Sequence, residues 1–144
     1  MRPTWDEYFM SLAREAASMS TCPRLSVGAV IVRDKQVIST GYNGAARGLP
    51  HCLDDGCLIV DGHCVRTVHA EANSLLFAGV ERTQEATMYV THLPCYHCAG
   101  LIINAGIKQV VYGTAYGSSA GHGLLKTTGI NVRKLHVGND LMRE

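Results

Sequence analysis

The chain has 144 residues, a length that suits one domain with a single hydrophobic core. Hydrophobic residues make up 47% of it and charged residues 17%, which excludes a disordered chain and favours a compact globular protein. The formal net charge is +1, and no run of basic residues is longer than Arg133-Lys134, which argues against a nucleic acid polymer as partner. We therefore expect residues 1–144 to form one domain. The low net charge does not exclude a small anionic ligand, because such a ligand needs only one or two local cations.

The chain contains no apolar segment of the roughly 20 residues needed to span a bilayer. Its N-terminus also lacks the apolar core of a signal peptide. We therefore expect a cytoplasmic protein without membrane contact. In that compartment, six cysteines favour metal binding or catalysis over disulfide bonds.

The N-terminal part predicts one helix followed by a β-hairpin. Thr4 and Glu7 have the spacing of a capping box, and apolar residues then recur at helical spacing as far as Ser18. The β-rich run 27–32 and the run 37–40 are separated by a short polar turn, which predicts a hairpin.

The rest of the chain predicts an irregular segment and then alternating helices and strands. Residues 43–66 are rich in Gly, Cys, His and Asp, and so long an irregular stretch in a compact domain is usually functional. The later predicted elements are a helix over 68–77, a strand over 87–91, a helix over 95–105, a strand over 110–112, a helix over 121–128 and a strand over 132–135. The order α-β-β-α-β-α-β-α-β predicts a three-layer α/β/α sandwich with a mixed five-stranded sheet.

Two short motifs supply the residues of a catalytic zinc site. His69-Ala70-Glu71 precedes Pro94-Cys95-Tyr96-His97-Cys98, and this pattern is typical of zinc-dependent nucleobase deaminases. One His and two Cys fill three of four zinc positions, whereas a structural zinc is usually closed by four protein ligands. Cys95 and Cys98 share one face of a predicted helix start, and His69 begins another predicted helix, so two positive helix ends can converge on the metal. Glu71 would then carry protons rather than bind the metal.

Around these motifs the chain resembles the deoxycytidylate (dCMP) deaminases of the cytidine deaminase-like superfamily, of the type found in bacteria and their viruses. The resemblance covers nearly the whole chain, and beyond the two motifs it rests on residues 27–32, 41–44, 63–71 and 102–107. It implies a cytidine deaminase-like fold and the hydrolysis of dCMP to dUMP and ammonia for thymidylate synthesis. It also implies zinc on His69, Cys95 and Cys98, with Glu71 as the proton carrier.

The resemblance further implies substrate contacts. Asn43 matches the asparagine that contacts sugar and base, although an Asn there is equally consistent with a left-handed turn. Ala70, between His69 and Glu71, is a further expected substrate contact. Tyr116 and Ser118 follow the fourth strand and are expected at the phosphate end of the nucleotide pocket, with ordinary packing as the alternative.

Regulation and assembly are expected from the family alone. Its members are typically homo-oligomers, as hexamers, activated by dCTP with Mg²⁺ and inhibited by dTTP. The allosteric nucleotide lies near the Gly-Tyr-Asn-Gly loop, which makes Asn43, Gly44 and Arg47 the candidate contacts. Arg47 is equally consistent with a solvated loop charge.

Four cysteines outside the motif suggest a second, structural zinc. Some family members carry such a zinc in this region, and a metal would help hold the long loop. Zinc needs four convergent ligands, and the alternative is that several of these thiols are reduced, buried and apolar in character. The groups available are His51, His63 and the first choice of four thiols, Cys22, Cys52, Cys57 and Cys64.

Packing explains the remaining histidines without a functional role, and these are His92, His97, His122 and His136. Two other functions remain open. One is a related deaminase acting on cytidine, dCTP or tRNA adenosine, of which tRNA is disfavoured by the neutral charge. The other is a zinc-stabilised binding protein without catalysis, which would have no need for an unligated Glu71.

Overall fold

The computed structural model describes residues 1–135, so the prediction for His136 lies outside the described residues. Its main elements are α1 (Trp5–Ala17), β1 (Gly28–Arg33), β2 (Gln36–Tyr42), α3 (Ala70–Ala78), β7 (Thr87–His92), α5 (Tyr96–Asn104), β8 (Gln109–Thr114), α6 (Ala120–Thr127) and β9 (Asn131–Lys134). The shorter elements are β3 (Gly44–Ala45), α2 (Cys52–Asp55), β4 (Ile59–Val60), β5 (His63–Cys64), β6 (Thr67–Val68) and α4 (Val80–Thr83). Within residues 1–135, no helix is both long and apolar enough to cross a membrane.

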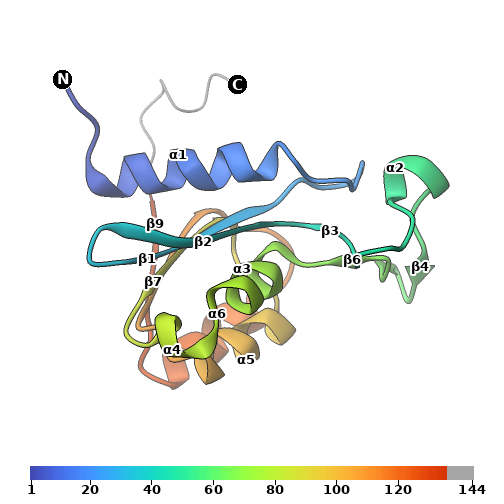
Figure 1. Cartoon of the computed structure of the whole chain (residues 1–144). Coiled ribbons are helices and arrows are strands. Elements are labelled where there is room, and N and C mark those ends of the chain that lie inside the picture. Colours follow the sequence, from blue (N-terminus) through green and yellow to red (C-terminus); the bar gives the residue numbers. More distant parts are fainter. Residues whose placement is uncertain (136–144) are drawn as a thin grey trace.

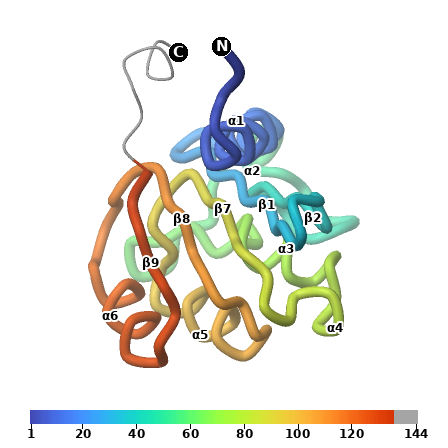
Figure 2. Tube along the Cα trace, turned by 90° about the vertical axis from the view of Figure 1, so that its left-hand side faces the viewer, coloured from blue at the N-terminus to red at the C-terminus, as the bar shows by residue number. Residues whose placement is uncertain are grey.

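The main sheet has five strands in the order β2-β1-β7-β8-β9, which lie side by side in Figure 2. Strand β1 is antiparallel to both β2 and β7, whereas β7, β8 and β9 run parallel to one another. The predicted mixed five-stranded sheet is therefore confirmed.

Helices cover both faces of this sheet. Helix α1 lies on one face, and α3, α5 and α6 lie on the other (Figure 1). Strand β1 serves both layers, because Val30 and Val32 pack in the cluster under α1, whereas Ala29 and Ile31 pack in the larger cluster on the opposite face. Burial on both faces explains why this strand is an unbroken apolar run. The predicted three-layer α/β/α sandwich is confirmed.

The first helix and the hairpin form for the reasons that the sequence suggests. The Thr4 hydroxyl accepts from the backbone N–H of Glu7, and the Glu7 carboxylate accepts from the backbone N–H of Thr4, which completes the capping box. In the hairpin turn, Asp34 and Lys35 both have positive φ, 53° and 60°, as a two-residue turn that matches the strand twist requires.

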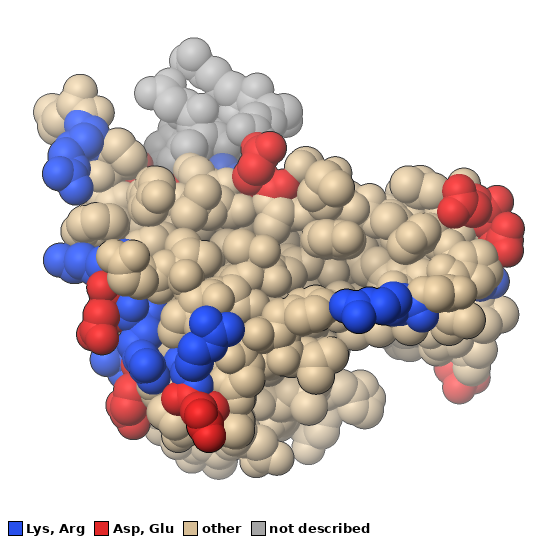
Figure 3. Space-filling view, in the orientation of Figure 1, with Lys and Arg blue, Asp and Glu red and all other residues tan. Residues whose placement is uncertain are grey.

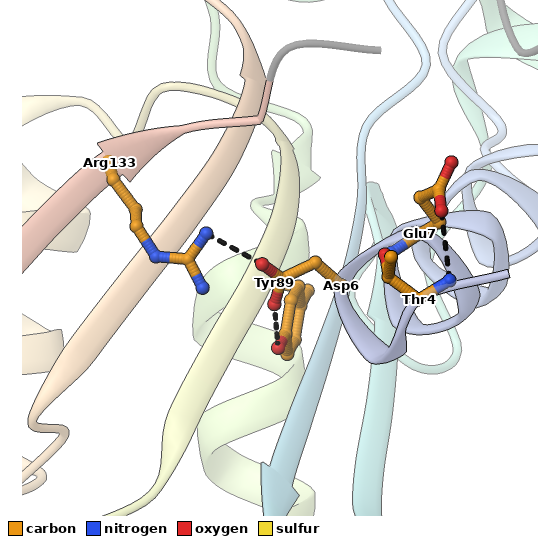
Figure 4. A network of polar contacts seen from close by, with 5 residues as sticks. All are labelled: Thr4, Asp6, Glu7, Tyr89 and Arg133. Carbon is orange, nitrogen blue, oxygen red and sulfur yellow. Dashed lines mark hydrogen bonds and ion pairs between the residues drawn. The ribbon is translucent and has the colours of Figure 1, made fainter. Parts of the chain in front are cut away.

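A polar clamp fixes α1 to the sheet (Figure 4). The Tyr89 hydroxyl of β7 donates to Asp6 of α1 at 2.6 Å, and Arg133 of β9 lies 2.7 Å from the other carboxylate oxygen. The hydrogen bond from Arg133 lowers the pKa of Asp6, and burial raises the pKa of the Tyr89 phenol. The clamp therefore contains an ionised carboxylate and a neutral phenol at neutral pH.

The segment over residues 46–66 stands to one side of the sheet, where Figure 1 shows α2 and β4. The prediction of an irregular stretch over residues 43–66 is wrong in part, because this stretch contains short elements: β3, α2 and the β4–β5 hairpin with Ile59 opposite Cys64. Many of its large apolar side chains are exposed: Leu49, Leu53, Leu58, Ile59, Val60 and Val65. On the face in Figure 3, basic and acidic side chains mix at the left-hand edge, a basic patch lies to the right of the centre, and the area between them is largely uncharged.

Two predicted helix starts are shifted by one or two residues. The helix predicted from 68 begins at Ala70, because Val68 pairs with Gly44 in the β3–β6 ladder and His69 becomes the N-cap. The helix predicted from Cys95 begins at Tyr96, and Cys95 is its N-cap. The short helix α4, after Gly79, was not predicted. These shifts place two of the predicted zinc ligands, His69 and Cys95, at cap positions.

Candidate active site

The predicted zinc ligands come from two helix starts at one edge of the sheet. His69 is the N-cap of α3, Cys95 is the N-cap of α5, and Cys98 lies in the first turn of α5. Neither N-cap side chain bonds its own helix, so both are available to a ligand. The backbones of α3 and β2 are in close contact, as shown by Gly41, where an added Cβ would overlap the backbone oxygen of Ala70. Backbone packing thus fixes the position from which His69 projects.

The spacing of these three side chains fits a tetrahedral zinc ion. Their ligand atoms all lie within 4.8 Å of one another. The His69 Nδ1 atom is 3.6 Å from the Cys95 Sγ atom and 3.3 Å from the Cys98 Sγ atom. Tetrahedral zinc with ordinary Zn–S and Zn–N bonds separates nitrogen and sulfur ligands by about 3.6 Å. The donor set, one imidazole and two thiols, is also one that zinc prefers.

Glu71 is a buried carboxyl group beside these ligands. It lies in the first turn of α3, and only 5% of its surface is exposed. Burial raises the pKa of Glu71 to about 7. Its oxygens are not among the three converging ligand atoms, so the geometry leaves Glu71 free for a role other than ligation.

The side chains of His69, Cys95 and Cys98 polarise one another. Hydrogen bonds from Cys98 and then His69 lower the pKa of the Cys95 thiol to about 3. The hydrogen bond to Cys95 also raises the pKa of His69. The pKa of the Cys98 thiol is raised, first by its hydrogen bond to Cys95 and then by burial. The lowered pKa of the Cys95 thiol favours a thiolate at this site, which suits a cation.

Asn43 precedes Gly44, which pairs with Val68 next to His69, and its side chain is engaged with the backbone. Its Oδ1 accepts from the N–H of Val27 at 2.9 Å, and its Nδ2 donates to the carbonyl of Leu25 at 2.7 Å. Only 7% of Asn43 is exposed. Its φ is not positive, so the left-handed turn considered for it is absent. The geometry supports a role in holding residues 25–27, a role that the sequence does not reveal.

The other expected nucleotide contacts are distributed as follows. Ala70 is fully buried against β2, whereas Tyr116 is 58% exposed on the loop between β8 and α6. The Ser118 hydroxyl accepts from the backbone N–H of Ala120 in that same exposed loop. Gly44 is paired in β3, and Arg47 is exposed and makes no ion pair among residues 1–135. The side chains of Tyr116, Ser118 and Arg47 are thus accessible to a ligand, and that of Ala70 is not.

The four remaining cysteines gather at the base of the 46–66 segment. The ligand atoms of Cys22, Cys52 and Cys57 lie within 4.8 Å of one another, and the Cys64 Sγ atom lies 3.5 Å from that of Cys52. His51 instead contacts the Thr21 hydroxyl at 3.1 Å, and His63 is exposed. All six cysteines of the chain fall within the described residues and are free thiols. The geometry therefore favours the four cysteines over the two histidines as a ligand set.

Residues 3–114 match the protein-family model of the cytidine and deoxycytidylate deaminase zinc-binding region, and this range includes both cysteine groups. The chain belongs to this family. The deoxycytidylate deaminase of Mycobacterium phage D29 is 46% identical over 77% of the chain and 95% of that protein. The structure of the dCMP deaminase from cyanophage S-TIM5 in complex with dCMP and dUMP matches this chain with a TM-score of 0.81 and 30% identity. The match covers 94% of this chain and 99% of the cyanophage chain.

Other members of the deaminase family are longer than the matched region. ComE operon protein 2 of Bacillus subtilis is 53% identical over 80% of the chain, and the match spans 62% of that protein. The deoxycytidylate deaminase of Saccharomyces cerevisiae is 46% identical over 93% of the chain, and the match spans 46% of that protein. The matched region thus spans about half to two thirds of the length of these two relatives.

Proposed function

We propose that the chain is a single-domain enzyme that hydrolyses dCMP to dUMP and ammonia and so supplies dUMP for thymidylate synthesis. The observation that carries the proposal is the buried Glu71 beside three side chains with the spacing of an open zinc site. A purely structural zinc site would be closed by a fourth protein ligand and would not need this carboxyl group. The names of the relatives supply the substrate class.

His69, Cys95 and Cys98 would hold the zinc ion. A zinc ion held by these residues would supply a water of lowered pKa, from 15.7 to about 7, as the nucleophile. Glu71 accepts a proton as water attacks the ring carbon that bears the amino group, delivers it to the neighbouring ring nitrogen, and then assists loss of ammonia. Because Glu71 is shielded from bulk solvent, its proton remains available for transfer within the site.

The substrate is tested by following ultraviolet absorbance during incubation with dCMP, cytidine and dCTP. We expect turnover of dCMP at a kcat/KM well above that of the other two. Equal rates on cytidine and dCMP would contradict selectivity for the monophosphate, and no turnover of any cytosine nucleotide would contradict the enzymatic function. The substrate contacts proposed for Tyr116 and Ser118 are supported by the exposure of both residues on the loop that follows β8. Asn43 and the buried Ala70 would act mainly by shaping the pocket.

We further propose a second, structural zinc on Cys22, Cys52, Cys57 and Cys64. The sulfur atoms of Cys22, Cys52 and Cys57 lie within 4.8 Å of one another, and Cys64 lies 3.5 Å from Cys52, close to the separation of about 3.8 Å between sulfur ligands of tetrahedral zinc. This metal would tie the end of α1 to the 46–66 segment, whose own apolar content is mostly exposed. The proposed use of all six cysteines as zinc ligands would require reduced thiols, which supports a cytoplasmic location.

Assembly and regulation complete the proposal. Exposed apolar residues on α3, α4 and α5, namely Leu76, Phe77, Val80, Tyr96 and Leu101, support a homo-oligomer, for which the family suggests a hexamer. Binding of dCTP with Mg²⁺, or of dTTP, is supported by the accessible Arg47. The engaged side chain of Asn43 and the paired Gly44 would offer backbone groups at most.

A further inference from the structure

Thr91 and His92 form a hydrogen-bonded chain at the carboxyl end of β7. The backbone N–H of Gly28 donates to the Thr91 hydroxyl at 3.2 Å, and that hydroxyl lies 2.8 Å from Nδ1 of His92. Thr91 is buried, with 8% of its surface exposed. A sequence pattern attributes no function to either residue, because a threonine and a histidine at a strand end are ordinary.

This series of hydrogen bonds selects one tautomer of His92. The Thr91 hydroxyl has a single proton, and its oxygen already accepts from Gly28. Every group is satisfied when the hydroxyl proton is donated to Nδ1, because a buried hydroxyl proton without an acceptor is costly. Nδ1 is then unprotonated, and the ring carries its proton on Nε2. Burial lowers the pKa of His92, which keeps the ring neutral at neutral pH.

The His92 ring packs against the β8–α6 loop. It meets the Tyr116 ring edge to face, with ring centroids 6.1 Å apart, and His92 pairs with Thr114 in the β7–β8 ladder. The start of helix α6 is in close contact with the turn that leads to Cys95, as shown by Gly121, where an added Cβ would overlap the backbone oxygen of Pro94. His92 is thus three residues from a proposed zinc ligand and beside the loop that we expect at the phosphate end.

Nothing in the part of the chain that the structure describes bonds Nε2 of His92, so its N–H is available to a ligand. We propose that His92 donates this hydrogen bond to the phosphate of the nucleotide and that Thr91 is the positioning residue that holds the donor tautomer. The inference rests on the proposed function, since it specifies where that site binds the 5′-phosphate. An N–H bonded to an anionic oxygen is stronger than a neutral pair, which suits a contact that selects a nucleotide over a nucleoside.

The test compares His92→Phe, which keeps an aromatic ring against Tyr116, with His92→Gln, which restores an amide donor. His122→Phe is the matched control, because His122 is also half-buried and meets a tyrosine edge to face, at 6.3 Å from Tyr112. Each zinc-loaded variant is measured for zinc content, for kcat and KM with dCMP, and for affinity toward dUMP and deoxyuridine. Loss of one hydrogen bond to a charged group predicts about a 10- to 100-fold rise in KM and in the dUMP Kd for His92→Phe. We expect kcat, zinc content and deoxyuridine affinity to stay close to wild type, and His92→Gln to recover part of the loss.

The tautomer is measured directly by ¹⁵N NMR of the histidine side chains. Wild type and Thr91→Ser are expected to show unprotonated Nδ1 and protonated Nε2 at His92, whereas Thr91→Val loses this preference and binds dUMP more weakly. Unchanged dUMP affinity in folded His92→Phe, equal weakening of deoxyuridine, or protonated Nδ1 in wild type would each overturn the inference. Failure of wild type to convert dCMP would instead overturn the proposed function.

Discussion

Glu71→Gln tests the catalytic role of the buried carboxyl group. Glutamine has nearly the same shape, so it fills the same space at the start of α3 and leaves His69, Cys95 and Cys98 in place. It cannot accept and return a proton. General acid–base groups contribute about 10²- to 10⁴-fold in rate. At 1.36 kcal/mol per tenfold, the activation barrier should rise by about 3 to 5 kcal/mol.

The assay is the initial rate of dCMP deamination at saturating substrate, with zinc content measured on the same preparation. Glu15→Gln is the matched control, because Glu15 is an exposed glutamate on α1. We expect the control to retain wild-type kcat, and Glu71→Gln to keep its zinc while losing at least a hundredfold in kcat. A fully zinc-loaded Glu71→Gln with a rate within tenfold of wild type would refute the role of Glu71 as proton carrier.

Three further predictions address stability and assembly. Cys57→Ser should lose one zinc per chain and melt at a lower temperature while the remaining zinc still supports turnover, and an unchanged zinc content would contradict the second site. Asp6→Asn should lower the free energy of unfolding at pH 7 by about 1 kcal/mol, since Arg133 is partly exposed. The folded-state pKa of Asp6 is lowered, so this stabilisation is present above its unfolded pKa of about 3.9 and is lost as pH falls through the folded pKa. Urea titrations at pH 7 and pH 3 should therefore differ in the Asp6→Asn penalty, and an equal penalty at both would contradict the clamp. Phe77→Asp, on the exposed side of α3, should reduce the mass measured by light scattering, because it places a charge in the proposed oligomer interface. An equal mass for the variant and the wild type would contradict an interface at this face.

Local sequence patterns predicted most of the fold. The capping box of Thr4 and Glu7, the hairpin and the apolar run of β1 each depend on neighbouring residues, and all were confirmed. The exact starts of α3 and α5 were missed. Val68 is drawn into a strand by pairing with Gly44, and such a partner from a distant segment leaves no trace in local periodicity.

The site could be predicted only as far as its motifs extend. His69, Cys95 and Cys98 have a recognisable spacing, and the structure brings them together. The hydrogen bonds of Asn43 to residues 25–27 and the link from Gly28 through Thr91 to His92 join segments distant in sequence. These contacts depend on sheet register and loop path, which a single sequence does not specify.

The most direct test of hydrolytic dCMP deamination is mass spectrometry of the product formed from dCMP in water labelled with ¹⁸O. Zinc-loaded protein should convert dCMP to dUMP with one ¹⁸O atom in the ring carbonyl and release one ammonia per dUMP. Removal of zinc by a chelator should stop the reaction, and added zinc should restore it. Formation of no dUMP, or of dUMP without the solvent oxygen, would contradict the account.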